Sequence, residues 1–246
     1  MLAVRIRPPI THDASTIPTR FQRTVIHPSS TTTVTVDNVS GPPLSAGGVA
    51  TAPPASSTGK KQTFAFDQVH APATTQYQLY TSTAAPLVSR FVEGYNCTVL
   101  AYGQTSSGKT YSMTGVDLDA DPTDPTNGMG IVPRAISAIF AKADELRRER
   151  GSAWQWSLKA SFVELYNEDL IDLLAVGDVS SMKQDVQIRE DKDGTIIWGG
   201  LREIPVRSAQ DVMAYVVKVR HDRCLANVSS VSLNAALPTV VQTRRT

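Results

Sequence analysis

The residues with the clearest chemical potential form a run rich in glycine and serine that ends in lysine and threonine. The run fits the phosphate-binding pattern G-x-x-x-x-G-K-[ST] and consists of Gly103, Gln104, Thr105, Ser106, Ser107, Gly108, Lys109 and Thr110. Such a loop wraps backbone N–H groups around phosphate oxygens, helped by the positive end of the helix that follows. In this pattern Lys109 reaches the β- and γ-phosphates, and the Thr110 hydroxyl holds Mg²⁺. The sequence therefore predicts a site for a nucleoside triphosphate.

The flanks of this run must place the loop between a strand and a helix. Residues 98–102 are apolar and partly β-branched, which predicts the strand, and residues 109–113 contain no helix breaker. The alternative is an ordinary Gly/Ser turn before a helix. The complete pattern with both flanks favours the phosphate loop.

The rest of the chain supplies the elements that must position the loop. Alternation and β-branched residues predict strands over 3–7, 34–36, 63–66 and 156–162, and a hairpin over 186–198. Helical periodicity and caps predict helices over 75–94 (kinked at Pro86), 133–150, 170–174 and 208–219. Because strands and helices intermix around a phosphate loop, we expect a three-layer α/β domain. Residues 38–60, rich in Gly, Pro, Ser and Ala, are predicted to be a flexible low-complexity insertion.

Composition narrows the class of protein. The chain has 246 residues, 41% of them apolar, which fits one large domain or two small ones. A net charge of +1 predicts neither a nucleic-acid nor a membrane partner, and no apolar run approaches the roughly 18 residues of a membrane span. The two cysteines, Cys97 and Cys224, form no disulfide framework and show no metal spacing, which fits a reducing cytosolic or nuclear compartment.

The sequence around the phosphate loop is similar to the kinesin motor signature. Residues 94–115 read Gly-Tyr-Asn-Cys-Thr-Val-Leu-Ala-Tyr-Gly-Gln-Thr-Ser-Ser-Gly-Lys-Thr-Tyr-Ser-Met-Thr-Gly. Further segments resemble the family in the same order, at residues 4–8, 64–67, 130–135, 161–168 and 200–206. The resemblance covers nearly all of residues 2–220, and the variant is similar to chromokinesins.

This resemblance implies an ATP-driven microtubule motor domain with the kinesin fold of P-loop NTPases. It implies ATP or ADP and Mg²⁺ as ligands, microtubules as the partner, and a cytoplasmic, cytoskeletal location, with the nucleus or spindle also expected. By resemblance, Arg5, Arg7 and Pro8 lie against adenine and Tyr111 faces the base. A proline, a guanidinium plane and an aromatic ring suit a purine. From the residues alone, a solvated strand face is the favoured interpretation of Arg5 and Arg7.

The family pattern breaks near the end of the chain. Residues 232–234 resemble the approach to the first nucleotide switch, but the 246 residues contain neither Ser-Ser-Arg-Ser-His nor the second switch, Asp-x-Ala-Gly-Ser-Glu. We therefore expect residues 1–234 to be the N-terminal part of a motor domain, incomplete at its C-terminus, and 235–246 a divergent tail. No catalytic residue is identified. We predict weak nucleotide binding, negligible ATPase activity alone, and a phosphate-loop strand left uncovered. The alternatives are a P-loop NTPase of another lineage and a non-catalytic nucleotide-binding fragment.

Other polar clusters receive simpler interpretations. Asp117, Asp119, Asp121 and Asp124 lack the glycine and terminal glutamate of a calcium loop, so we expect a solvated acidic loop. We interpret Glu164, Glu168 and Asp169 as a strand end and helix cap, and the arginines at 147, 148 and 150 as cations suited to a helix C-terminus. By resemblance, the 190–198 hairpin with Lys192 is nearer to the surface presented to microtubules. His12, His27, His70 and His221 show no ligand spacing.

Overall fold

The computed structural model describes residues 1–9, 24–37, 61–151, 155–175, 186–194, 196–225 and 233–234. The chain divides into two compact units, Met1–Thr74 and Thr75–Thr246, and each is described by itself. The predicted insertion at 38–60 and the predicted tail at 235–246 lie outside the described residues, as do the side chains of His12, His221 and Cys224.

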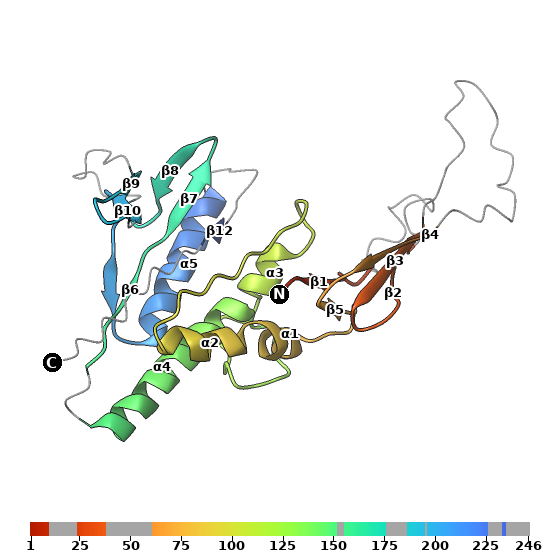
Figure 1. Ribbon diagram of the computed structural model, residues 1–246, viewed down its shortest axis with the longest axis horizontal. Coiled ribbons are helices and arrows are strands. Elements are labelled where there is room, and N and C mark those ends of the chain that lie inside the picture. Colours follow the sequence, from red (N-terminus) through yellow and green to blue (C-terminus); the bar gives the residue numbers. More distant parts are fainter. Residues whose placement is uncertain are drawn as a thin grey trace, which may run out of the picture. The chain divides into compact units, whose positions relative to one another are not determined.

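In the described part of the first unit, the regular elements are all strands (Figure 1). Strand β1 (Ala3–Arg5) pairs in parallel with β5 (Gln68–His70), while β2 (Ile26–Pro28), β3 (Thr33–Asp37) and β4 (Lys61–Ala65) form an antiparallel sheet. The strands predicted at 3–7, 34–36 and 63–66 are confirmed. Strands β2 and β5 were not predicted, because each is short and β2 ends in a proline, a residue that argues against a strand interior.

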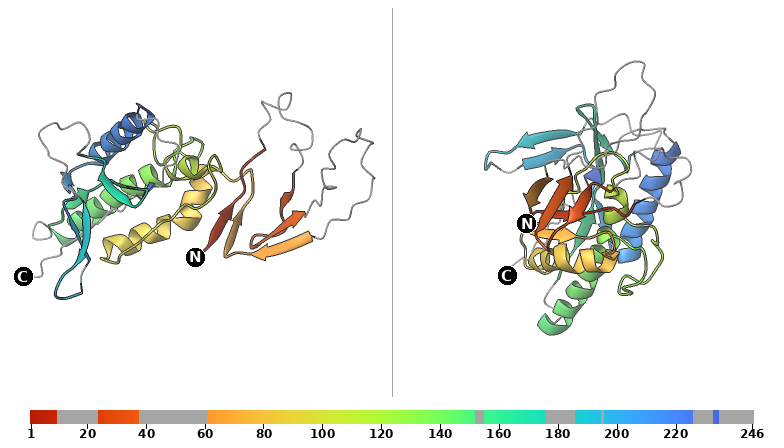
Figure 2. Two further views of the ribbon diagram at one scale, coloured as in Figure 1. Left: turned by 90° about the horizontal axis from the view of Figure 1, so that it is seen from above. Right: turned by 90° about the vertical axis from the view of Figure 1, so that its right-hand side faces the viewer.

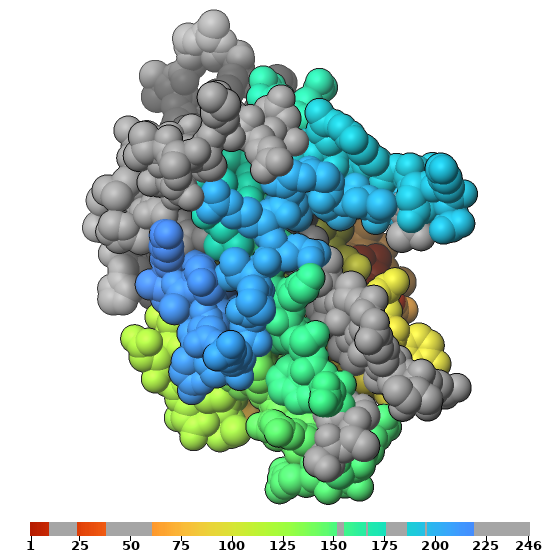
Figure 3. Space-filling model, turned by 90° about the vertical axis from the view of Figure 1, so that its left-hand side faces the viewer, coloured from red at the N-terminus to blue at the C-terminus, as the bar shows by residue number. Residues whose placement is uncertain are grey.

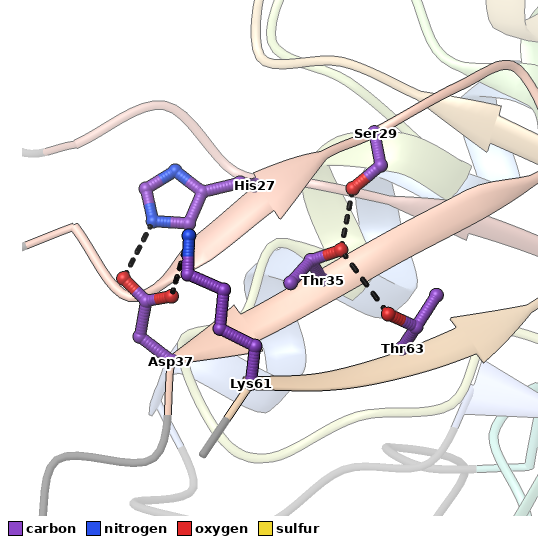
Figure 4. Close-up of polar contacts among 6 residues, drawn as sticks. All are labelled: His27, Ser29, Thr35, Asp37, Lys61 and Thr63. Carbon is purple, nitrogen blue, oxygen red and sulfur yellow. Dashed lines mark hydrogen bonds and ion pairs between the residues drawn. The ribbon is translucent and has the colours of Figure 1, made fainter. Parts of the chain in front are cut away.

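The antiparallel sheet of the first unit has one polar face. The His27 ring lies 3.2 Å from an Asp37 carboxylate oxygen, and Lys61 lies 4.0 Å from the other (Figure 4). Along the same face, the hydroxyls of Ser29 and Thr35 are 2.6 Å apart. Because side chains alternate along a strand, Val34, which is 4% exposed, lies on the opposite face.

Two short helices begin the second unit. Helix α1 (Gln76–Thr83) begins with the predicted capping box. The Thr75 hydroxyl accepts from the Gln78 backbone amide, and the Gln78 side-chain oxygen accepts from the Thr75 backbone amide. The predicted kink is instead a break at Ala84, and α2 (Ala85–Val92) carries proline in its first turn, where no N–H is needed. Gly94, with φ +99°, ends α2: the Gly94 and Tyr95 amides donate to carbonyls of the last turn.

A long helix organises the core of the second unit. Helix α4 (Ile131–Arg150) contacts α1, α2, α3 (Lys109–Met113) and α5 (Ala209–Leu225), and Figure 2 shows its length beside the shorter helices. Its predicted apolar face is confirmed, with Ile136, Ile139, Phe140 and Ala143 all buried. The Phe140 and Trp156 rings meet edge to face at 5.4 Å. Gly151 ends α4 as predicted, and a Ser208–Asp211 cap opens α5.

Short strands complete the second unit. Strand β6 (Leu158–Ala160) pairs with β11 (Ile204–Val206), and β7 (Val163–Tyr166) pairs with β8 (Asp169–Asp172) and β12 (Leu233–Asn234). The predicted hairpin is confirmed as β9 (Gln187–Glu190) and β10 (Ile196–Gly199). In Figure 3 this hairpin projects from the surface of the unit, and Lys192 is exposed in its turn.

The helix predicted over 170–174 is wrong, because residues 170–172 lie in strand β8 (Asp169–Asp172) and residues 173–174 form a turn. Asn167 and Glu168 have φ +48° and +72°, and the register pairs Tyr166 with Asp169. Two left-handed residues between paired strands make a tight hairpin turn. Glu164 therefore lies buried in β7 and Glu168 occupies the turn, so the helix-cap interpretation of these carboxylates is also wrong.

The strand predicted over 98–102 does not form. The structure assigns no regular element there, and Val99, Leu100 and Tyr102 are 41%, 75% and 97% exposed. The residue types suit a strand, but a strand exists only through hydrogen bonds to a neighbour. Within the described residues, no backbone hydrogen bond of this segment is found.

The α/β class is confirmed, with a qualification about the sheet. The second unit contains both helices and strands, in the order α1 to α4, β6 to β11, α5 and β12, and the helices form layers beside the strands as an α/β domain requires. In the part of the chain that the structure describes, the strands form small separate sheets of two or three strands. The helices and strands of an α/β domain are therefore present, but the described strands do not join into one continuous sheet.

Candidate nucleotide site

The phosphate loop turns through left-handed backbone into helix α3. Ser106 and Gly108 have φ +63° and +104°, and Gly108 is the N-cap of α3. Gly103 has φ +154°, which a side chain rarely adopts, and a Cβ there would also lie 2.6 Å from the Ser107 hydroxyl oxygen. The Ser107 amide donates to the Gln104 carbonyl, closing a turn inside the loop. The glycines of the pattern are thus required by the backbone of this loop.

The Lys109 side chain turns back over the loop that precedes it. Its ammonium donates to the carbonyl oxygens of Gly103 at 2.8 Å and Gln104 at 2.9 Å. An ammonium has a third N–H donor, and carbonyls bind it less strongly than an anionic oxygen does. The loop therefore holds the Lys109 cation through contacts with two uncharged carbonyl oxygens.

Thr110 and Tyr111 follow on α3 with exposed side chains. The Thr110 residue is exposed, and the Tyr111 residue is 44% exposed. The Thr110 carbonyl accepts from the amides of Thr114 and Gly115, which closes the last turn of the helix. The hydroxyl of Thr110 is a hard oxygen ligand of the kind that Mg²⁺ accepts beside phosphates and water, so its chemistry fits the predicted metal role.

The residues expected at adenine belong to the first unit. Arg5 lies in β1, where its guanidinium donates to the Thr74 carbonyl at 3.3 Å, and Arg7 and Pro8 are exposed. His70 pairs with Arg5 across the strands. Burial, and then the charge of Arg5, lower the pKa of His70 below its ordinary value. The adenine role of these residues stays a prediction.

Two buried residues that were not predicted from the sequence donate hydrogen bonds to backbone carbonyls of α3 and of the segment that follows it. Gln76, which is 3% exposed, donates its side-chain amide to the Tyr111 carbonyl at 2.5 Å and to the Gly128 carbonyl at 3.3 Å. Arg134, 1% exposed on α4, donates to the Met129 carbonyl at 3.0 Å. Burial lowers the pKa of Arg134, while the charges around it act in the opposite direction. Neither residue gave a signal in the helical pattern: Arg134 lies about half a turn away from the predicted apolar face of its helix, and Gln76 stands in no motif.

The two ends of the segment between α3 and α4 pair with each other. Gly115 and Met129 form an isolated bridge, and the Gly130 amide donates to the Thr114 carbonyl at 3.1 Å. Arg134 also donates to the Pro122 carbonyl, the Asp124 carbonyl and the Asn127 side-chain oxygen. The connection therefore wraps one buried guanidinium.

The aspartates of this connection cap its turns. The Thr123 hydroxyl and amide both donate to Asp121, and the Thr126 hydroxyl and amide both donate to Asp124. These hydrogen bonds lower the pKa of each carboxyl below its ordinary value, and the hydroxyl contributes more than the amide. Asp117 accepts from the Gly128 amide at 2.6 Å. Among the described residues, no three His, Cys, Asp or Glu side chains gather as a metal site.

The remaining candidates lie apart from the loop. The arginines at 147, 148 and 150 are exposed in the last turn of α4. The Cys97 thiol contacts the Leu87 carbonyl at 3.5 Å. Within the described ranges, no helix is both long and apolar enough to cross a bilayer.

A glycine-rich loop entering a helix that begins with Lys-Thr is typical of P-loop nucleotide-binding proteins, although the strand that precedes the loop in that class does not form in the described residues. The family model described as kinesin motor domain matches residues 24–235. The chain belongs to the kinesin motor domain family. The alternative of a P-loop NTPase from another lineage is therefore set aside.

Curated relatives match over much of this chain. It is 37% identical to the chromosome-associated kinesin KIF4 of Gallus gallus, over 70% of this chain and 13% of that protein. It is 39% identical to the kinesin-like protein Klp61F of Drosophila melanogaster, over 65% of this chain and 14% of that protein. The chain thus spans about an eighth of the curated relatives it matches.

A solved structure supports the same fold. A chain from "Structure of a fast kinesin: Implications for ATPase mechanism and interactions with microtubules" matches with a TM-score of 0.67 and 25% identity. The match covers 92% of this chain and 54% of that chain. The kinesin motor fold predicted from the sequence is confirmed.

Proposed function

We propose that this chain binds a magnesium–nucleotide complex, with ATP or ADP as the nucleotide, through residues 103–110. The observation that carries the proposal is the Lys109 ammonium held against the loop carbonyls by contacts of 2.8 and 2.9 Å. A triphosphate offers anionic oxygens in exchange, and an ammonium–phosphate contact adds the attraction of opposite charges that an ammonium–carbonyl contact lacks.

In this proposal each part of the loop contacts a different part of the ligand. Backbone amides of the loop cradle the phosphates, Lys109 contacts the β- and γ-phosphates, and Thr110 supplies one ligand to Mg²⁺. When bound, Mg²⁺ neutralises phosphate charge. Tyr111, with Arg5, Arg7 and Pro8 from the first unit, is assigned to the base because these positions match the family pattern.

The function of the whole protein is proposed to be ATP-driven movement along microtubules. Family membership supports this proposal, and the exposed turn of the β9–β10 hairpin with Lys192 is the proposed microtubule contact. We place the protein on the microtubule cytoskeleton, in the cytoplasm or on the spindle and in the nucleus.

Catalysis by these 246 residues alone is proposed to be negligible. The sequence contains neither switch motif, and ground-state phosphate contacts without groups that orient the attacking water give binding with little rate. A non-catalytic nucleotide-binding fragment is therefore the second candidate function for the isolated polypeptide.

Two assays separate these proposals. Phosphate release by the purified chain should equal that of Lys109→Ala, and turnover clearly above this control would refute the claim of negligible catalysis. Co-sedimentation with taxol-stabilised microtubules in a non-hydrolysable ATP analogue would support the motor assignment. Absence of pelleting with a folded chain would leave only the nucleotide-binding function for this polypeptide.

A further inference from the structure

Helix α3 carries the key phosphate contacts but cannot hold its own position. It has only five residues, none of them buried, and its N-cap Gly108 makes no side-chain cap. Helices this short are marginal without tertiary contacts. The direction in which Lys109 and Thr110 point must therefore be fixed from outside the helix.

Gln76 supplies such a contact at the carbonyl of Tyr111. In a continuing α-helix the Gly115 amide would donate to this carbonyl, but it donates to the Thr110 carbonyl instead, at 3.1 Å. The Gln76 amide nitrogen lies 2.5 Å from the Tyr111 carbonyl oxygen. A donor from α1 thus serves a carbonyl that the helix leaves without its usual partner.

The same amide group also reaches the far end of the connection. Its contact with the Gly128 carbonyl, at 3.3 Å, joins α1 to the strand-like pair formed by Gly115 and Met129. Because an amide has two N–H donors, one side chain can serve both carbonyls. Gln76 therefore links α1, α3 and the connection within one buried cluster.

The neighbouring residue on α1 anchors this cluster to α4. The Tyr77 ring lies under the Arg134 guanidinium, with 5.2 Å between the Arg134 central carbon and the ring centroid. Arg134 in turn donates to the Met129 carbonyl, one residue after Gly128. Consecutive residues of α1 thus hold both the end of α3 and the end of the connection.

We infer that Gln76 is a positioning residue of the nucleotide site, which fixes α3 so that Lys109 and Thr110 face the bound phosphates. The inference rests on the proposed function, because it takes α3 to carry the phosphate contacts. Loss of the two N–H donors leaves the Tyr111 carbonyl without its donor from α1 and loosens the helix that presents the lysine.

The test replaces Gln76 with methionine, which keeps the length of the side chain and removes the donors. The matched control is Gln210→Met, at an exposed position of α5. Two quantities are measured on the 246-residue chain: the Kd for a fluorescent ATP analogue with Mg²⁺, and amide hydrogen exchange of residues 109–115. Gln76→Met should weaken binding about tenfold and speed this exchange about tenfold, values equivalent to loss of about one net hydrogen bond. Exchange in the β7–β8 hairpin should not change.

A second variant keeps the test decisive if methionine prevents folding. Gln76→Asn retains the amide on a shorter side chain and should bind with an affinity between those of the wild type and Gln76→Met. Binding and exchange equal to wild type in a folded Gln76→Met chain, or in Gln76→Asn where the former does not fold, would overturn the inference. Absence of saturable binding by the wild type refutes the proposed function instead, so the two failures are distinct.

Discussion

Gly130 lies where the end of the connection between α3 and α4 packs directly against the backbone at the end of α3. Its backbone, with φ −83° and ψ −167°, is open to any residue, so glycine is not required there for conformational reasons. A Cβ at Gly130 would nevertheless lie 2.6 Å from the Met113 carbonyl oxygen and 2.7 Å from the Thr114 carbonyl carbon. Both atoms are backbone, so neither can move without moving the end of α3.

We therefore predict that Gly130→Ala destabilises the second unit. Overpacking a close contact costs about 1–3 kcal/mol, and the backbone on both sides places this case in the upper half of that range. For a domain of this size, each kcal/mol lowers the Tm by roughly 2–4 °C, so we expect a fall of about 6 °C. The same displacement should weaken ATP binding, because α3 presents Lys109.

Urea unfolding followed by tryptophan fluorescence measures this cost. All three tryptophans, at 154, 156 and 198, belong to the second unit, so the signal reports on it. The control is Gly199→Ala, where the nearest atom, the Gln187 carbonyl oxygen, lies at 3.6 Å, an ordinary contact. If the two variants unfold within about 0.5 kcal/mol of each other, the steric reasoning is wrong.

Three further changes test the fold of each unit. Phe140→Ala removes a buried ring from the core and its edge contact with Trp156, and should cost about 3–5 kcal/mol in urea unfolding, accompanied by a shift in tryptophan emission. His70 has a lowered pKa, so the unfolded chain binds its proton at higher pH than the folded chain does, and stability should fall as the pH drops below about 6.5. His70→Leu should reduce that dependence, as measured by circular dichroism in urea at about pH 7.5 and about pH 5.5; an unchanged slope would contradict the assignment. Glu168→Gly relieves a left-handed residue in the β7–β8 turn and should stabilise the second unit by about 0.5 kcal/mol, and any loss of stability would count against the turn geometry.

Signals that lie close together in the sequence predicted the structure well. The capping box of Thr75 and Gln78 and the glycine stop at Gly94 both depend on contacts within a few residues. The apolar face of α4 follows from periodicity alone. These features needed no knowledge of the rest of the fold.

Features that depend on distant partners were predicted poorly. Residues 98–102 have strand-forming side chains, but no neighbour pairs with them in the described residues. Strand β8 looked helical because the turn at Asn167 and Glu168 lacks the glycine that commonly marks such turns.

The candidate site shows the same division. Its glycines, lysine and threonine stand in a recognisable local pattern, whereas the role of Gln76 arises from carbonyls 35 and 52 residues away. A lone buried glutamine carries no spacing signal, so only the folded structure reveals it.

The most direct test of the account is equilibrium binding of ATP with Mg²⁺ to the folded chain. The wild type should bind saturably, and Lys109→Ala should bind about tenfold or more weakly, because it loses charge-assisted hydrogen bonds worth roughly 1.5–3 kcal/mol. Lys218→Ala, at an exposed position of α5, should bind like the wild type. Saturable binding that depends on Lys109 but not on Lys218 is the predicted result; a folded chain with no saturable binding, or with equal affinity in all three proteins, would contradict the account.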